Sequence, residues 1–262
     1  GAGKTTTFRM IVGLLEPDEG KITLNGKDIN YDITDQIGFL TEERSLFTKM
    51  TVVDQIVYYG SLKNLDKKTI LERLDYWLKV FNIEEYKNLK IKELSKGNQQ
   101  KIQFISAVIN NPKLLILDEP FSALDPFNVS IMMDAIRDLS KKGTIVIFSS
   151  HRMEHVEMFC EKLLILVKGE SILQGSLKGI KEDYQKKFIH INGDINLKEI
   201  ENLEGVENIE KTPEEIIVKI SNKDIIKKVF DVIKKGENIT RFYVEDPTLN
   251  EIFVSKVGES LE

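Results

Sequence analysis

Cysteine and long apolar segments are what this 262-residue sequence most clearly lacks. Its one cysteine, Cys160, excludes an intrachain disulfide framework and suits a reducing compartment. No apolar run approaches the roughly 18 residues that a membrane-spanning helix needs, so a role at a membrane requires spans from another chain. Hydrophobic residues at 41% and charged residues at 30% are ordinary for a globular protein with a sizeable buried core.

Clustered basic charge is scarce as well. Residues 1–180 hold 24 Lys/Arg and 24 Asp/Glu, whereas residues 181–262 hold 13 and 18, so the acidic excess lies in the tail. Neither part has the basic surface that is typical of a nucleic-acid-binding domain. We therefore expect no nucleic acid among its partners.

Segments typical of strands alternate with segments typical of helices over the first two thirds of the chain. An Asn25-Gly26 turn, a short QIGFL strand, a helix start with Thr51 and Asp54 at capping-box spacing, helical apolar spacing over 70–81, and the apolar runs KLLILDEP and GTIVIFSS follow one another. This order predicts an α/β domain over residues 1–177, with a mainly parallel sheet and a helical insertion at about 48–94. Over residues 178–262 the order β-α-β-β-α-β predicts a small α+β ferredoxin-like domain.

The first residues, GAGKTT, match the end of a phosphate-binding loop, G-x-x-x-x-G-K-[ST]. The first glycine of that pattern and the strand before it would lie upstream of Gly1. We therefore expect a truncated amino terminus, and expect that restoring the native upstream residues strengthens ATP binding. Backbone N–H groups and a helix N-terminus favour phosphate oxygens, Lys4 adds a mobile positive charge, and the Thr5 hydroxyl can bind Mg²⁺.

Two carboxylates follow the apolar run LLIL. Asp118 and Glu119 stand at the carboxyl end of a predicted buried strand, where open α/β sheets bind ligands. Asp118 is suited to hold Mg²⁺, and Glu119 to orient and deprotonate an attacking water. The alternative is that the two acids only cap the next helix, an alternative that the phosphate loop makes weaker.

Leu94–Gln100, LSKGNQQ, resembles the signature motif of ABC ATPases, which is usually LSGGQ. The phosphate loop, IGFLTEE, the helical insertion, LSKGNQQ, LLILDEP, SALD and FSSH also come in the order of that family, over residues 1 to about 175. The ending EDPTLNEIF is similar to the accessory domain of ATP-binding subunits of type-2 ABC exporters, which extrude drugs, antibiotic peptides or sodium.

The resemblance implies ATP and Mg²⁺ as ligands and assigns roles by position. Catalysis would fall to Lys4, Glu119 and His151, with the last as the γ-phosphate switch. The implied ATP-binding residues are Gly1, Ala2, Gly3, Lys4, Thr5, Thr6, Glu42 and His151, and the implied Mg²⁺ ligands are Thr5, Glu42 and Asp118. Across a dimer, the residues that would contact the other subunit's ATP are Ser95, Lys96, Gly97 and Asn98. The D-loop beside them would consist of Ser122, Ala123, Leu124 and Asp125.

Some of these positions depart from the family pattern or have simpler explanations. Lys96 and Asn98 differ from LSGGQ, and Glu42 stands where the family has glutamine; a carboxylate there adds charge near Mg²⁺. The alternatives are a surface ion cluster at 42–44, a plain helix cap at 95, and a turn at 122–125 before a proline. A zinc pair of His151 and His155 is set aside because Arg152 replaces the glutamate that the zincin motif requires, which leaves His155 and His190 as structural or surface residues.

We therefore expect an ATP-binding and ATP-hydrolysing subunit that works as a head-to-tail dimer, either homodimer or heterodimer. It would power a separately encoded multi-span permease acting as an exporter, from the cytoplasmic side, as a peripheral subunit on the inner face of the cell membrane. The alternative is a soluble ABC ATPase acting on nucleic acid or ribosomes. Those proteins usually fuse two cassettes or insert coiled coils, and neither feature is found here. A third alternative, a binding module without hydrolysis, conflicts with the presence of Lys4, Asp118, Glu119 and His151.

Overall fold

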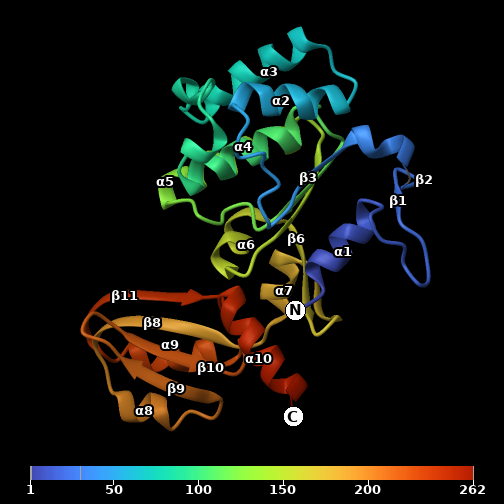
Figure 1. Cartoon of the computed structure of the whole chain (residues 1–262). Coiled ribbons are helices and arrows are strands. Elements are labelled where there is room, and N and C mark those ends of the chain that lie inside the picture. Colours follow the sequence, from blue (N-terminus) through green and yellow to red (C-terminus); the bar gives the residue numbers. More distant parts are fainter. Residues whose placement is uncertain (1, 30, 262) are drawn as a thin grey trace. The chain divides into compact units, whose positions relative to one another are not determined.

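The computed structural model of the chain describes residues 2–29 and 31–261. Two compact units make up the chain, Gly1–His151 and Arg152–Glu262 (Figure 1). Within the described ranges, no helix is both long enough and apolar enough to cross a membrane.

A parallel sheet forms the centre of the first unit. Its strands are β3 (Ile37–Leu40), β4 (Leu114–Asp118) and β5 (Ile145–Ser149), with β4 in the middle. All five residues of β4 are buried, which explains its uninterrupted apolar sequence. The predicted α/β fold with a parallel sheet is confirmed.

Helices cover this sheet through close contacts. On α1 (Lys4–Ile11), Phe8 packs in one cluster with Ile37, Leu114 and Ile116 of the sheet. The helix α4 (Lys96–Val108) passes so near β3 that a Cβ added to Gly38 would lie 2.1 Å from the carbonyl oxygen of Ala107. Only glycine permits that approach. The longer α5 (Pro126–Lys141) precedes β5.

The predicted helical insertion contains α2 (Val52–Leu62), α3 (Lys67–Val80), η2 (Glu84–Tyr86) and η3 (Ile91–Glu93), and Figure 1 shows α2 and α3 beside α4. The Thr51 hydroxyl accepts a hydrogen bond from the Asp54 backbone N–H at 3.2 Å, as the capping pattern predicts. Trp77 is buried against the rings of Phe81 and Phe104, so it belongs to the core.

Between α1 and β3, the chain forms a two-stranded hairpin and a short 3-10 helix. The hairpin pairs β1 (Thr23–Leu24) with β2 (Lys27–Asp28), and η1 (Tyr31–Gln36) follows. Asn25 and Gly26 have φ values of 53° and 79° at the hairpin turn. Because two positive φ values are typical of a type I′ turn, the predicted Asn-Gly turn is confirmed.

The second unit begins with α6 (Met153–Phe159), the antiparallel pair β6 (Lys162–Val167) and β7 (Glu170–Ser176), and α7 (Leu177–Asp183). Its main sheet is antiparallel in the order β11-β8-β10-β9, formed by β8 (Lys187–Asp194), β9 (Val206–Lys211), β10 (Ile216–Ile220) and β11 (Glu237–Glu245). Two helices, α8 (Leu197–Glu201) and α9 (Ile225–Ile233), bury apolar side chains against it, and α10 (Leu249–Leu261) follows. The β-α-β-β-α-β order agrees with the ferredoxin-like prediction. The domain boundary after residue 177 stays a prediction.

Candidate nucleotide-binding and hydrolysis site

The phosphate loop ends in an open helix N-terminus. Gly3, the N-cap of α1, has φ 97°, and no side chain caps the helix. A positive φ is easily adopted only by glycine, and an uncapped first turn leaves backbone N–H groups free to meet an anion. Lys4, Thr5 and Thr6 form this first turn, with Ala2 half-buried just before it. Gly1, also predicted to bind ATP, lies outside the described residues.

Five of the predicted site residues meet at the carboxyl end of β4. The Thr5 hydroxyl donates a hydrogen bond to Oδ2 of Asp118 at 2.9 Å. One oxygen of Glu119, Oε1, lies 3.4 Å from the Lys4 Nζ and 2.9 Å from the His151 Nδ1. Asp118 is 1% exposed and Glu119 8% exposed. The start of α1, the end of β4 and the segment just after β5 therefore bring these side chains together.

Two further side chains contact the same acids and were missed from the sequence. The Ser149 hydroxyl donates to Oδ1 of Asp118 at 2.5 Å and accepts from the Glu119 backbone N–H at 3.2 Å. The Gln100 Nε2 donates to the carbonyls of Pro120 at 3.1 Å and Glu119 at 3.4 Å. Both residues lie inside quoted motifs, FSSH and LSKGNQQ. Their place within those motifs was the only signal in the sequence that could have identified them.

The donor set fits Mg²⁺. A hydroxyl that donates a hydrogen bond to a carboxylate, as the Thr5 hydroxyl does to Asp118, keeps lone pairs that can bind a cation. Among the described residues no three His, Cys, Asp or Glu side chains group as metal ligands. A cation held at Asp118 would therefore need water or phosphate oxygens too, which is how Mg²⁺ usually binds.

Glu42 is exposed in the loop after β3. The backbone of this loop is fixed from α4, because the Gln103 Nε2 donates to the carbonyls of Thr41 at 2.8 Å and Glu43 at 3.3 Å. Across residues 2–29 and 31–261, the Glu42 carboxylate has no hydrogen bond or ion pair, and none joins it to Arg44. The Mg²⁺ role of Glu42 stays a prediction.

The signature segment and the D-loop touch each other within one chain. Ser95 caps α4 by accepting the Asn98 N–H at 3.2 Å. Beside it, Gly97 packs so closely that an added Cβ would lie 3.1 Å from the Ala123 carbonyl oxygen. Lys96 is exposed next to this contact. Helix capping by Ser95 is thus present, and any contact with a second subunit's ATP stays a prediction.

The D-loop itself is a constrained turn. Ala123 has φ 62°, and Leu124 follows it before the helix. Asp125 caps α5 by accepting hydrogen bonds from the Asn128 backbone N–H at 3.0 Å and side-chain amide at 2.6 Å. These hydrogen bonds, the backbone one foremost, lower the pKa of Asp125. Ser122 precedes them, with its N–H donating to the Glu119 carbonyl at 3.1 Å.

The remaining histidines, His155 and His190, lie in the second unit and are both buried. His155 is buried on α6. His190 is buried on β8, with Nδ1 3.0 Å from a Glu215 carboxylate oxygen and Nε2 3.0 Å from a Glu245 one. Its ring stacks on Tyr243. These contacts account for the buried position of the His190 side chain.

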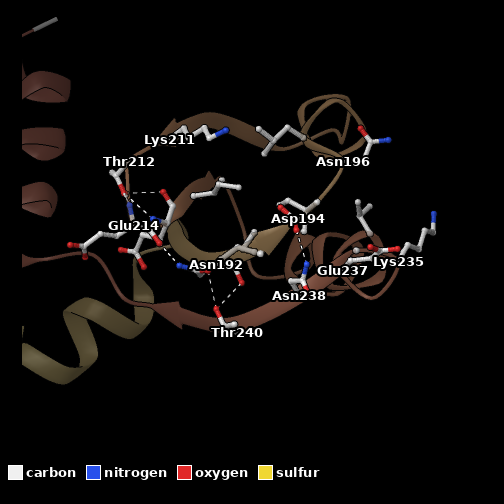
Figure 2. A pocket seen from close by; sticks show the side chains of 18 of the residues that line it. Asn192, Asp194, Asn196, Lys211, Thr212, Glu214, Lys235, Glu237, Asn238 and Thr240 are labelled. Carbon is white, nitrogen blue, oxygen red and sulfur yellow. Dashed lines mark hydrogen bonds between the residues drawn. The ribbon is translucent and has the colours of Figure 1, made fainter.

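The second unit also contains an open pocket of about 750 Å³, shown in Figure 2. Its side chains largely satisfy one another. The Asn238 amide donates to Asp194 at 3.0 Å and the Thr240 hydroxyl to the Asn192 side chain at 2.9 Å. Lys235 pairs with Glu199 at 2.6 Å. No arrangement resembling the acid cluster of the first unit is found there.

Comparison with known proteins gives a consistent result for both units. A family model described as "ABC transporter" matches residues 1–122. A second model, described as "ATP-binding protein DrrA1-3-like, C-terminal domain", matches residues 175–257. The two matches correspond to the phosphate-loop region and to the ferredoxin-like region.

Individual relatives match over most of their length. The chain is 49% identical over 262 residues to an uncharacterized ABC transporter ATP-binding protein, YhaQ, of Bacillus subtilis, covering 100% of this chain and 88% of the relative. It is 32% identical over 203 residues to the lipopolysaccharide export system ATP-binding protein LptB of Haemophilus influenzae, covering 75% and 84%. A solved structure titled as the ATP-binding subunit of an ABC transporter superposes with a TM-score of 0.65 at 28% identity, covering 70% of this chain and 78% of that one.

Proposed function

The chain belongs to the ATP-binding proteins of ABC transporters, ATPases whose hydrolysis is coupled to transport, and we propose that it powers a separately encoded membrane exporter as half of a head-to-tail dimer. The observation that carries the proposal is the convergence of Lys4, Asp118, Glu119 and His151 on one site. The relative LptB, an export-system protein by its name, supports the exporter direction.

The part of ATP that would bind at this site is its phosphate chain. The first turn of α1 presents N–H groups and Lys4 presents a charge, so this end of the helix would hold the β- and γ-phosphates. Thr5 and Asp118 would hold Mg²⁺, which neutralises phosphate charge when bound. Ala2, Gly3 and Thr6 would shape the loop around the phosphates.

Hydrolysis itself needs a base beside the terminal phosphate. As the water oxygen bonds to the γ-phosphorus, Glu119 would take the water's proton, and ADP would leave with the electrons of the broken P–O bond. His151 already contacts Glu119 at 2.9 Å and is exposed, so it can also reach a phosphate oxygen. These contacts support the proposed roles of Glu119 as the base and of His151 as the sensor of the γ-phosphate.

The dimer follows from where the signature lies. Ser95 and Lys96 are exposed, and among the described residues no hydrogen bond or ion pair joins them to the Lys4 loop of the same chain. The N-terminus of α4 carries about half a positive charge, which suits a phosphate held by a second subunit. Head-to-tail pairing of two copies, or of this chain with a related one, would bring the two together.

An exposed aromatic surface supports the membrane partner. Phe47 is 45% and Tyr58 44% exposed, and their rings lie 5.4 Å apart. The Tyr59 ring completes the group, with its hydroxyl donating to the Ser45 carbonyl at 2.7 Å. Aromatic side chains that stay exposed are typical of protein interfaces. Through this surface and the neighbouring Glu42 loop, the subunit would bind the permease at the inner face of the membrane.

The test of hydrolysis and pairing uses Glu119→Gln, which keeps the size of the side chain but removes the base. We expect unchanged binding of a fluorescent ATP analogue, loss of ATP turnover, and an ATP-dependent dimer by light scattering. A variant that hydrolyses ATP at the wild-type rate would remove Glu119 as the base.

The test of the partner uses the exposed aromatic surface. Tagged wild-type chain, Tyr58→Ala and the control Tyr243→Ala are recovered from native membranes, and the bound proteins are identified. We expect a multi-span membrane protein with wild type and control, and its loss with Tyr58→Ala. Recovery of ribosomes without a membrane protein would favour the nucleic-acid alternative.

A further inference from the structure

Ser149, the last residue of β5, links both acids of the site. It lies opposite Asp118 in the register of the parallel pair and is 5% exposed. Its hydroxyl donates to Asp118 Oδ1 at 2.5 Å. The same oxygen accepts the Glu119 backbone N–H at 3.2 Å. One hydroxyl therefore acts as donor to one acid and acceptor from the next.

The backbone of Glu119 is in a conformation that its sequence disfavours. Residues before proline favour extended conformations, yet Glu119, which precedes Pro120, has φ 51°. L-residues pay a conformational penalty at such φ values, which persist where surrounding contacts hold them. Three contacts do so here: Ser149 accepts from the N–H, and the Ser122 N–H at 3.1 Å and the Gln100 amide at 3.4 Å donate to the carbonyl.

The carboxylate of Asp118 is held from both sides. Oδ1 accepts from Ser149 and Oδ2 accepts from Thr5 at 2.9 Å. A buried carboxylate requires such donors, because desolvation without hydrogen bonds is costly. With Ser149 on one oxygen, the other oxygen is directed toward Thr5 and the phosphate loop.

We propose that Ser149 is a positioning residue for ATP hydrolysis, fixing the backbone of Glu119 and the orientation of Asp118 through a single hydroxyl. The inference rests on the proposed roles of these two acids. The proposal also links His151, two residues beyond the end of β5, to the proposed base. A shift of the end of β5 would move Ser149, and with it the direction of the Glu119 side chain.

The chemistry of position 149 makes the role testable. Alanine can neither donate nor accept, so Ser149→Ala leaves a buried N–H and a carboxylate oxygen without this partner. Threonine keeps the hydroxyl and suits a strand, so Ser149→Thr should restore function. Cysteine fills a similar volume but is a weak donor and acceptor, so Ser149→Cys should preserve the fold without the role.

The experiment measures steady-state ATP hydrolysis against ATP and Mg²⁺ concentration, with binding of a fluorescent ATP analogue and thermal unfolding in parallel. We expect kcat to fall about 10- to 100-fold in Ser149→Ala and Ser149→Cys, the effect of losing a hydrogen bond to a charged group. The KM for ATP and nucleotide binding should change little, half-saturation by Mg²⁺ should rise, and Ser149→Thr should keep near wild-type kcat. Ser106→Ala is the matched control, because the Ser106 hydroxyl donates only to the Ile102 carbonyl within α4.

Two outcomes overturn the inference: wild-type kcat in both Ser149→Ala and Ser149→Cys, or equal loss in Ser149→Thr and Ser149→Ala. If Ser149→Ala fails to fold, the comparison of Ser149→Cys with Ser149→Thr decides. Glu119→Gln separates the two levels. Normal turnover in Glu119→Gln removes the proposed base and the role of Ser149 together, whereas an inactive Glu119→Gln beside a fully active Ser149→Cys removes only the role of Ser149.

Discussion

Gly97, at the start of α4, offers a prediction in which stability and activity separate. The perturbation is Gly97→Ala. In the structure an added Cβ at this position would lie 3.1 Å from the Ala123 carbonyl oxygen and 3.6 Å from the Leu124 Cδ2. The first distance is short enough that the D-loop must yield by a few tenths of an ångström.

Two opposing terms set the size of the stability change. Alanine stabilises a helix interior by about 1 kcal/mol relative to glycine, and somewhat less in the first turn. Moving Ala123 works against this gain, because that residue already occupies φ 62° in a tight turn. We expect the two terms to leave the melting temperature within about 4 °C of wild type. Activity should not be spared if the signature segment has its proposed role, because the added methyl group and the shifted D-loop both alter the surface that a phosphate would approach.

The assay compares ATP hydrolysis and thermal unfolding of wild type, Gly97→Ala and the same-helix control Ser106→Ala. Loss of an oxyanion-type contact predicts a fall in kcat on the order of 100-fold for Gly97→Ala. Nucleotide binding by the monomer should be retained, because the Lys4 loop is unchanged. Wild-type turnover in Gly97→Ala would refute both the close phosphate approach at this position and the importance of its contact with the D-loop.

Three further predictions concern stability and reactivity. Leu117→Ala removes a fully buried side chain from β4 and should lower the free energy of unfolding by about 2–5 kcal/mol, measured by urea denaturation; a smaller loss would contradict the close packing of the sheet. Burial raises the pKa of the Cys160 thiol to about 11, so at pH 8 its alkylation should be about 100-fold slower than that of a free thiol, followed by mass spectrometry in native buffer and in denaturant. Hydrogen bonds from Thr69, the side-chain one foremost, lower the pKa of Asp66 below 3.8 in the folded state. The stability that Asp66 gives to α3 is therefore present above that value and lost as the pH falls through the folded pKa. In Asp66→Asn, the free energy of unfolding should therefore depend less steeply on pH below about pH 4. An unchanged pH dependence in this variant would contradict the prediction.

The elements that could be predicted from the sequence are those with a periodic or motif signal. The apolar run before Asp118 identified β4, and the Thr51–Asp54 spacing identified the start of α2. In the second unit, the order of short amphipathic segments was enough to predict the ferredoxin-like fold. In each case the signal is local, because a buried strand or a helix cap depends on a few neighbouring residues.

The parts that escaped prediction depend on contacts between distant segments. In the sequence, Ser149 looks like any serine at the end of a strand. It contacts Asp118 only because β4 and β5 pair in register. The φ of Glu119 runs against the preference of a residue before proline, so local rules predict the wrong backbone. Gln100 likewise reaches the Pro120 carbonyl across 20 residues of sequence. Sequence reasoning located the acids but not what orients them.

The ion pair between Lys4 and Glu119 bears on how the proposed base is released. The two groups lie 3.4 Å apart, and the Lys4 side chain is 36% exposed, so solvent weakens the attraction and the pair contributes little to stability. A triphosphate arriving at the α1 N-terminus offers Lys4 several negative charges in place of one. Because the original pair is weak, ATP can take Lys4 with little loss and leave Glu119 with His151 alone. On the proposed roles, Glu119 therefore loses its ion pair with Lys4 only once ATP is bound, and ATP is the molecule that the activated water attacks.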